Sequence, residues 1–193
     1  MTGRRGLTPQ IVIDAAVEVV ETDGTGALTL SRVARELGVK PPSLYNHVTG
    51  LDTLRRDVAI KAIGDLAERL GTVAMGRSGR DAVTAIASEL RAYATAHPGL
   101  YELTTQARLD DQEFAAASMR PVEPVLAVLR GYDITGDEAI HAARALRASI
   151  HGFVALENIG GFGLDIDIDE SFRGLLDHRA GARERSAAPR GAD

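Results

Sequence analysis

Apolar residues recur three and four positions apart along most of this 193-residue chain. This spacing is typical of helices that bury one face, and no segment alternates apolar and polar residues as a half-buried strand does. The pattern therefore predicts an all-α fold of about nine helices. Pro121 predicts a kink, or the start of a fresh helix, in the seventh. The expected helices are 9–22, 30–37, 41–48, 51–70, 83–97, 100–109, 114–129, 137–157 and 170–176.

The stretch 28–48, LTLSRVARELGVKPPSLYNHV, predicts two short helices joined by a turn. Gly38 follows the last apolar position of the first helix, where a helix end favours a residue free to adopt positive φ. Pro41 and Pro42 suit the first turn of the second helix, because an N–H there would lack a helical partner. Leu44 can pin this helix to the first, which leaves a polar outer side. That arrangement is typical of a helix-turn-helix, whose second helix enters the DNA major groove. The outward residues are Ser43, Tyr45, Asn46 and His47.

The segments LTLSRVARELGV and PPSLYNHV resemble the DNA-binding domain of the TetR family of bacterial one-component regulators. The resemblance covers about residues 7–70, with many positions matching in order at fixed spacing. It implies that Thr29 and Ser31 lie at a helix start that contacts the DNA backbone. It also implies that Tyr45 and His47 contact phosphate groups or base edges.

One position departs from the family pattern, because Leu51 stands where family members often carry a lysine that holds a phosphate. The phosphate contact would then pass to Thr49, Arg55 or Arg56. An asparagine such as Asn46 can pair with an adenine edge. The expected DNA-binding residues are Thr29, Ser31, Pro42, Ser43, Tyr45, Asn46, His47, Thr49, Arg4 and Arg5.

The formal net charge of −5 is unusual for a DNA-binding protein. Residues 1–60 carry seven Lys or Arg and seven Asp or Glu, so the excess negative charge lies beyond them. DNA contact must therefore depend on the local arrangement of charge. Arg4 and Arg5 form a short arm that either touches DNA, at a phosphate or in the minor groove, or is a solvated terminus.

Residues 142–177, which include HGFVALENIGGFGLDIDIDESFRGLLD, resemble the C-terminal domain of a TetR subfamily. The resemblance implies that the last two helices pack against the same pair of a second subunit. A twofold dimer also suits DNA reading, because one recognition helix contacts too few bases to be selective. The alternative is that these residues form the core of one subunit. The expected dimer-interface residues are Ile150, Val154, Phe172, Leu175 and Leu176.

The remaining helices are expected to enclose a cavity for a small, largely apolar effector. Aromatic residues make up only 4% of the chain and Trp is absent, which disfavours an aromatic cage for organic cations. An aromatic residue in such a position is more often part of the ordinary core than of a pocket wall. The expected ligand-binding residues are Tyr93, His97, Tyr101, Arg108, Phe114, Met119, Phe153 and Glu157.

No catalytic or metal-binding constellation stands out in the sequence. Asp165, Asp167 and Asp169 resemble the start of a calcium loop, but its sixth and twelfth positions hold Glu170 and Leu176 where glycine and glutamate are required. No histidine pair has the spacing of a zinc site. We therefore expect no metal, no cofactor and no enzymatic activity.

The chain lacks cysteine, has no signal-like apolar segment near Met1 and has no apolar run approaching about twenty residues. We expect a cytoplasmic protein without membrane contact. The expected organisation is a helix-turn-helix domain at 1–50, a ligand-binding and dimerisation domain at 51–178 with helix 51–70 as linker, and a disordered tail at 179–193.

The leading hypothesis is a homodimeric transcriptional repressor, released from a palindromic double-stranded operator by a small effector. The alternative is a helical small-molecule-binding protein or enzyme with a vestigial DNA-binding head. Phosphate contact would make DNA affinity fall steeply with salt, which discriminates between the two.

Overall fold

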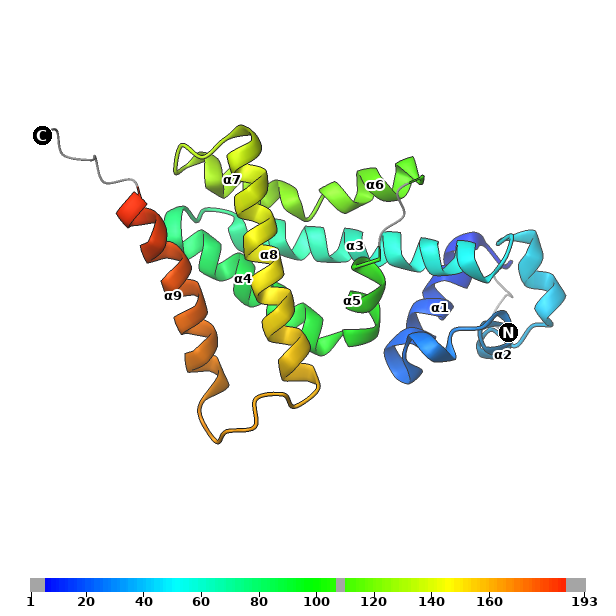
Figure 1. Cartoon of the computed structure of the whole chain (residues 1–193). Helices are drawn as coiled ribbons and strands as arrows, with labels where there is room; N and C mark the ends of the chain where they lie inside the picture. Colours follow the sequence, from blue (N-terminus) through cyan, green and yellow to red (C-terminus); the bar gives the residue numbers. More distant parts are fainter. Residues whose placement is uncertain (1–5, 107–109, 187–193) are drawn as a thin grey trace, which may run out of the picture. The chain divides into compact units, whose positions relative to one another are not determined.

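The computed structural model describes residues 6–106 and 110–186, with side chains up to residue 177. Within these ranges all regular structure is helical, in nine α-helices and two 3-10 helices (Figure 1). The all-α prediction is thereby confirmed. The helices are α1 (Pro9–Asp23), η1 (Thr25–Ala27), α2 (Leu30–Glu36), η2 (Pro41–Asn46), α3 (Leu51–Ala74), α4 (Gly79–Ala96), α5 (Pro98–Thr104), α6 (Gln112–Met119), α7 (Val122–Arg130), α8 (Gly136–Asn158) and α9 (Ile168–Ser186).

The ends of the first helices follow the local sequence. The Thr8 hydroxyl accepts a hydrogen bond from the backbone N–H of Ile11 at 3.2 Å, and Pro9 occupies the first turn of α1. Gly38 adopts a φ of +63° after α2, a conformation that residues with a Cβ rarely take. These two features fix where α1 begins and where the turn before η2 lies.

The second helix of the helix-turn-helix is a 3-10 helix, η2, in this structure. Pro41 and Pro42 have no N–H to donate, and the N–H of Ser43 bonds to the carbonyl of Lys40, three residues back, at 2.9 Å. The N–H of His47 also bonds three residues back, to Leu44, at 2.8 Å. Consecutive prolines thus favour the tighter helix.

The segment around Pro121 follows one of its two predicted forms, whereas the C-terminal segment differs from its prediction. Pro121 was expected to produce either a kink or the start of a fresh helix. The structure has the fresh helix, since α6 ends at Met119 and α7 begins at Val122. Helix α9 continues to Ser186, into the stretch expected to be a disordered tail from residue 179. Alanine, arginine and glutamate in that stretch favour helix. None of the helices in the described part of the chain is long and apolar enough to span a membrane.

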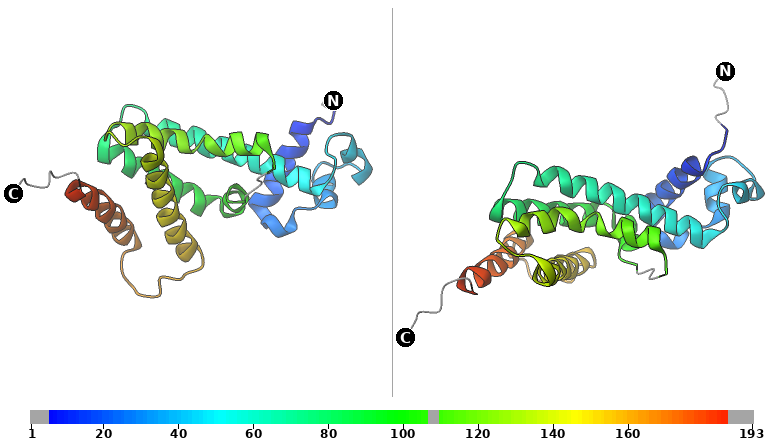
Figure 2. Two further views of the ribbon diagram at one scale, coloured as in Figure 1. Left: turned by 45° about the horizontal axis from the view of Figure 1, so that its top comes forward. Right: turned by 90° about the horizontal axis from the view of Figure 1, so that it is seen from above.

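The chain divides into two compact units. The first unit comprises Met1–Thr72 and Ala92–Pro124, and the second comprises Val73–Arg91 and Val125–Asp193. In the first unit, α1, α2 and η2 gather around the N-terminal end of α3, as both views of Figure 2 show in blue and cyan. We refer to α1, η1, α2 and η2 together as the head.

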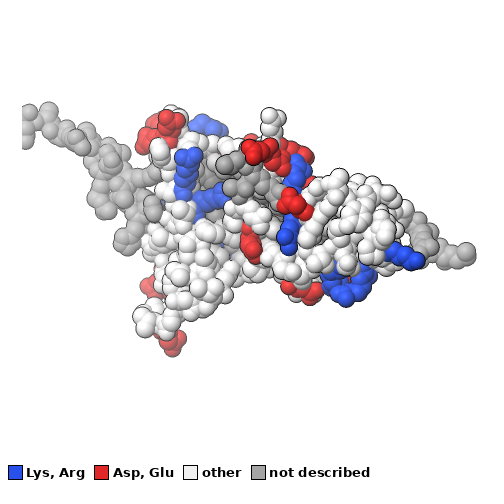
Figure 3. All heavy atoms as spheres, turned by 45° about the vertical axis from the view of Figure 1, so that its right-hand side comes forward, with Lys and Arg blue, Asp and Glu red and all other residues white. Residues whose placement is uncertain are grey.

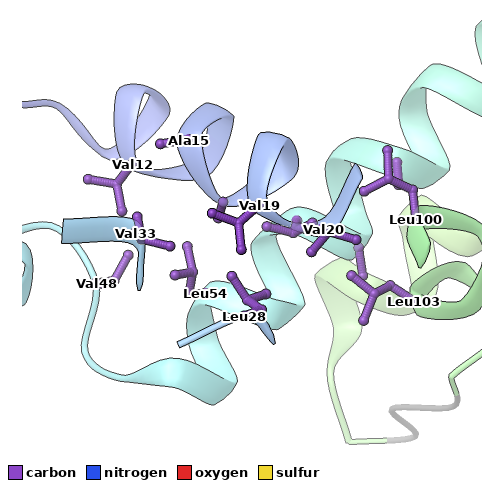
Figure 4. Packing of buried hydrophobic residues seen from close by; sticks show 14 of the residues in the cluster. Val12, Ala15, Val19, Val20, Leu28, Val33, Val48, Leu54, Leu100 and Leu103 are labelled. Carbon is purple, nitrogen blue, oxygen red and sulfur yellow. The ribbon is translucent and has the colours of Figure 1, made fainter. Parts of the chain in front are cut away.

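The head and α3 share one hydrophobic core (Figure 4). Leu28, Leu44 and Leu54 are fully buried in it. The same core continues to Leu103 of α5 and Phe114 of α6, which are 1% and 2% exposed. The head therefore packs on α5 as well as on the helix that follows it in sequence.

The second unit has a core formed by α8 and α9 together with part of α4. Ile150 and Val154 of α8 are each 1% exposed, and Phe172 of α9 is 3% exposed. The rings of Phe153 and Phe172 meet edge to face, with centroids 5.1 Å apart. Aromatic packing therefore joins α8 to α9 within this unit.

Candidate nucleic-acid interface

Helix η2 presents a buried side and an exposed side. Leu44 is fully buried and Val48 is 3% exposed, so both belong to the core of the head. Tyr45 lies on the opposite side, with 59% of its surface exposed, and Asn46 is also exposed. The apolar back holds the helix in place while hydrogen-bonding side chains face outward, which is the arrangement that base reading requires.

The other expected contact residues of η2 and the turn after it are accessible to different degrees. Pro42 and Thr49 are exposed, whereas Ser43 and His47 are half-buried. The hydroxyls of Thr49 and Thr53 lie 2.8 Å apart across the first turn of α3. All four expected residues therefore lie on or beside η2.

The start of α2 provides two further candidates. The Thr29 hydroxyl accepts a hydrogen bond from the N–H of Arg32 at 3.1 Å and so caps the helix. Ser31 is exposed in the first turn of the same helix. The predicted backbone-contacting residues thus stand at a helix N-terminus, where N–H groups face outward. Arg4 and Arg5 lie outside the described residues.

Two arginines near the head are held by carboxylates. Arg32 pairs with Glu36 at 2.5 Å and with Asp23 at 3.0 Å. The hydrogen bonds that Arg32 donates to these two carboxylates, to Glu36 foremost, raise its pKa. On the face shown in Figure 3, acidic and basic side chains form small separate groups and no continuous basic surface.

Arg56 is held more extensively than Arg32. Its guanidinium binds both carboxylate oxygens of Asp111 at 2.5 and 2.9 Å, Glu113 at 2.6 Å and Asp57 at 2.9 Å. The hydrogen bonds that Arg56 donates to Asp111, and then to Glu113, shift its pKa well above the ordinary value. Arg55 and Arg56 were both expected as possible phosphate contacts. The guanidinium of Arg56 is already bound by carboxylates. Arg55 is half-buried and makes no ion pair within the described parts of the chain.

Sequence reasoning overlooked two cations of the head. Lys40 directly precedes Pro41 at the N-terminal end of η2, and Arg35 lies in the last turn of α2. Both are exposed, and neither is ion-paired among the residues that the structure describes. A lysine next to the N-terminal end of a recognition helix is typical of a phosphate contact, so the sequence could have indicated Lys40. Leu51, at the family's lysine position, packs against the core of the head.

The expected ligand-binding residues in the first unit are mostly interior. Tyr93 is 2% exposed, and its hydroxyl donates to the carbonyl of Ala62 at 3.3 Å. Burial, above all, shifts the pKa of this phenol well above its ordinary value. Tyr101 and Phe114 are likewise buried, at 7% and 2%. Met119, at 48%, is exposed.

Phe153 and Glu157 lie in the second unit and share one neighbour, Arg91 of α4. Arg91 binds both oxygens of Glu157, at 2.5 and 2.8 Å, and pairs with Asp169 at 2.7 Å. Its guanidinium lies 5.4 Å from the ring centre of Phe153 and 4.8 Å from that of Phe172. We call this group the Arg91 cluster. Arg108, the remaining candidate, falls outside the described residues.

The expected dimer-interface residues are mostly buried within the chain itself. Ile150, Val154 and Phe172 are at most 3% exposed, and Leu176 is 7% exposed. Leu175 is half-buried. The burial of the first four favours the alternative that they form the core of one subunit.

Comparison with known proteins identifies the family. Residues 12–49 match the family described as bacterial regulatory proteins, tetR family, and residues 83–178 match a tetracyclin repressor-like C-terminal domain. A relative from Mycobacterium tuberculosis is 39% identical over 181 residues, covering 93% of this chain and 83% of its own. It is named as an uncharacterized HTH-type transcriptional regulator.

Solved structures share the fold. A protein of unknown function from Rhodococcus sp. RHA1 superposes with a TM-score of 0.80 at 21% identity, covering 94% of this chain and 98% of its own. TetR-Q116A from Acinetobacter baumannii AYE, in complex with minocycline, gives a TM-score of 0.71 at 21% identity, with 94% and 99% covered. The hypothesis of a vestigial head is not favoured by these matches. The chain belongs to the tetR family of bacterial regulatory proteins and is a DNA-binding transcriptional regulator.

Proposed function

We propose that the chain acts as a homodimeric repressor whose two heads read a palindromic operator. The observation that carries this proposal is η2, a helix backed by buried Leu44 with exposed Tyr45 and Asn46 on its outer side. Two such helices related by a twofold axis fit successive major grooves about 34–36 Å apart. In this proposal Thr29, Ser31 and Thr49 contact the DNA backbone.

The dimer surface that we propose lies around the C-terminal end of α8 and the connector to α9. Ile159, Leu164 and Ile166 are 78%, 76% and 63% exposed, and Leu156 is 46% exposed. Large apolar side chains grouped at such exposure commonly mark a protein interface. Since α8 and α9 bury their inner residues within the subunit, we propose that this outer apolar group is the surface that a second copy covers.

The release mechanism that we propose is the binding of a small effector to the body of the dimer. A structural relative was solved with minocycline bound, which supports a small organic molecule as the class of effector. Such a ligand shifts the heads only by the difference between its affinities for the DNA-binding and released conformers. We propose that the protein is not an enzyme and works in the cytoplasm.

The experiment that tests this function is selection of bound duplexes from a random DNA pool at moderate salt. A recovered palindrome with half-sites about one helical turn apart is the expected result. Failure to enrich any sequence, with the protein folded and dimeric before and after refolding, would remove the proposal.

A substitution then tests the reading helix itself. Tyr45→Ala should weaken binding to the selected operator at least about tenfold, because the ring is exposed and available to DNA. Dimerisation, measured by sedimentation, should not change. Met75→Ala is the matched control, because Met75 is 71% exposed and directly follows the C-terminal end of α3, whereas η2 directly precedes its N-terminal end. Operator affinity that survives Tyr45→Ala would contradict the assignment of η2.

A further inference from the structure

The C-terminal end of α1 and the adjoining η1 meet α5 and its N-cap residue, His97, in the first unit through two polar contacts. Nδ1 of His97 lies 2.9 Å from the carboxylate of Glu21, and the Thr25 hydroxyl donates to the carboxylate of Glu102 at 2.9 Å. The partners are 76 and 77 residues apart in sequence. We call this contact between α1–η1 and α5 the α1–α5 seam.

Backbone packing at the seam leaves no room for a side chain at position 99. A Cβ built on Gly99 would lie 2.9 Å from Cγ1 of Val20 and 3.0 Å from the carbonyl oxygen of Val20. The side chain could rotate away, but the carbonyl oxygen belongs to α1 itself and could move only with the helix. Figure 4 shows Val20 facing Leu100 and Leu103 of α5. Glycine at position 99 is therefore what lets α5 approach α1 this closely.

His97 also contacts Tyr93 of α4. Its ring lies 5.0 Å from the ring of Tyr93, which is 2% exposed and bonded to the carbonyl of Ala62 in α3. Arg69 of α3 lies over the same tyrosine ring, 5.4 Å from its centre. The seam therefore ties α1 through His97 and Tyr93 to Ala62, in the middle of α3.

We propose that the α1–α5 seam is a positioning element that fixes the angle of the head about α3, and so the distance between the two reading helices of the dimer. This inference rests on the proposed function. A head joined to the rest of the unit only at the end of α3 could tilt or rotate there, and a second contact away from that axis removes this freedom. Close-packed contacts change in discrete steps. Opening the seam therefore moves the head to a different orientation about α3.

The experiment compares Gly99→Ala with Gly26→Ala, a control in η1 where an added Cβ meets nothing within 4 Å. Binding is measured to the full palindrome and to a duplex that carries a single half-site, at low salt. Gly99→Ala should weaken binding to the palindrome at least about tenfold and leave half-site binding within about twofold. It should also shift the half-site spacing that a second selection recovers, which a merely destabilised head would not do.

Each outcome has a distinct meaning. If the unsubstituted chain binds neither duplex, the proposed function fails and the inference fails with it. Suppose instead that the unsubstituted chain binds both duplexes. If Gly99→Ala then weakens binding to the palindrome and to the half-site equally, or weakens neither, the inference alone is overturned.

A gentler pair of variants covers the case in which Gly99→Ala does not fold. Glu21→Gln removes the carboxylate and His97→Gln removes the imidazole, and neither adds volume to the seam. Each should weaken palindrome binding a few-fold at constant half-site binding, and the double variant should lose less than the product of the two single effects. Independent, multiplicative losses would overturn the coupling of these residues across the seam.

Discussion

The reading helix in the head and the Arg91 cluster in the second unit are held in their conformations by different kinds of interaction. In η2 the order comes from neighbours in sequence, since Gly38 and two prolines set the backbone and Leu44 anchors it. In the Arg91 cluster it comes from partners far apart in sequence, since one guanidinium joins α4 to Glu157 of α8 and Asp169 of α9. The first kind of order is visible in a sequence pattern, and the second kind depends on tertiary contact.

The largest expected effect tests the anchor of the reading helix. Leu44→Ala should lower the free energy of unfolding by about 2–5 kcal/mol, because Leu44 is fully buried and its truncation leaves a cavity. Tyr45→Ala, at the next position of the same helix, should change stability by less than about 0.5 kcal/mol because that side chain is exposed. Urea unfolding measures both. Equal effects at the two positions would mean that η2 is not held by an apolar back.

The same distinction explains what the sequence could predict. The helix boundaries of the head follow from Thr8, Thr29 and Gly38, whose effects act within a few residues. The roles of His97 and Glu157 did not follow, because their partners Glu21 and Arg91 lie 76 and 66 residues away. An apolar spacing likewise marks a residue as buried without saying whether its own subunit or a second copy covers it.

The dimer candidates illustrate that limit. Ile150 and Val154 have the spacing of an interface stripe, and they are buried inside the second unit. Ile159 and Leu164 fall outside any periodic stripe, in and near the connector between α8 and α9, and are the more exposed group. Helical periodicity could not have singled them out.

A smaller effect is expected at the Arg91 cluster. Arg91→Gln should lower the free energy of unfolding by about 1–3 kcal/mol, because it removes charge-assisted hydrogen bonds to Glu157 and the cation over two aromatic rings. Arg80→Gln is the matched control, since its pairing with Asp177 joins two side chains that are both 59% exposed. A pair so exposed contributes little, so the control should change by less than about 0.5 kcal/mol. Thermal unfolding of both variants would decide whether the cluster stabilises the second unit.

The smallest expected effect concerns two adjacent arginines that the sequence treats alike. Arg56 is bound by Asp111, Glu113 and Asp57, whereas Arg55 has no ion-pair partner in the described ranges. If Arg55 contacts a phosphate, Arg55→Gln should reduce the slope of log affinity against log salt by about one. Arg56→Gln should leave that slope unchanged, because a guanidinium already matched by three carboxylates releases no counterion on binding DNA. The measurement is operator affinity at several salt concentrations. A lowered slope for Arg56→Gln and an unaltered one for Arg55→Gln would reverse the assignment, and would mean that the Asp111 pairing opens when DNA binds.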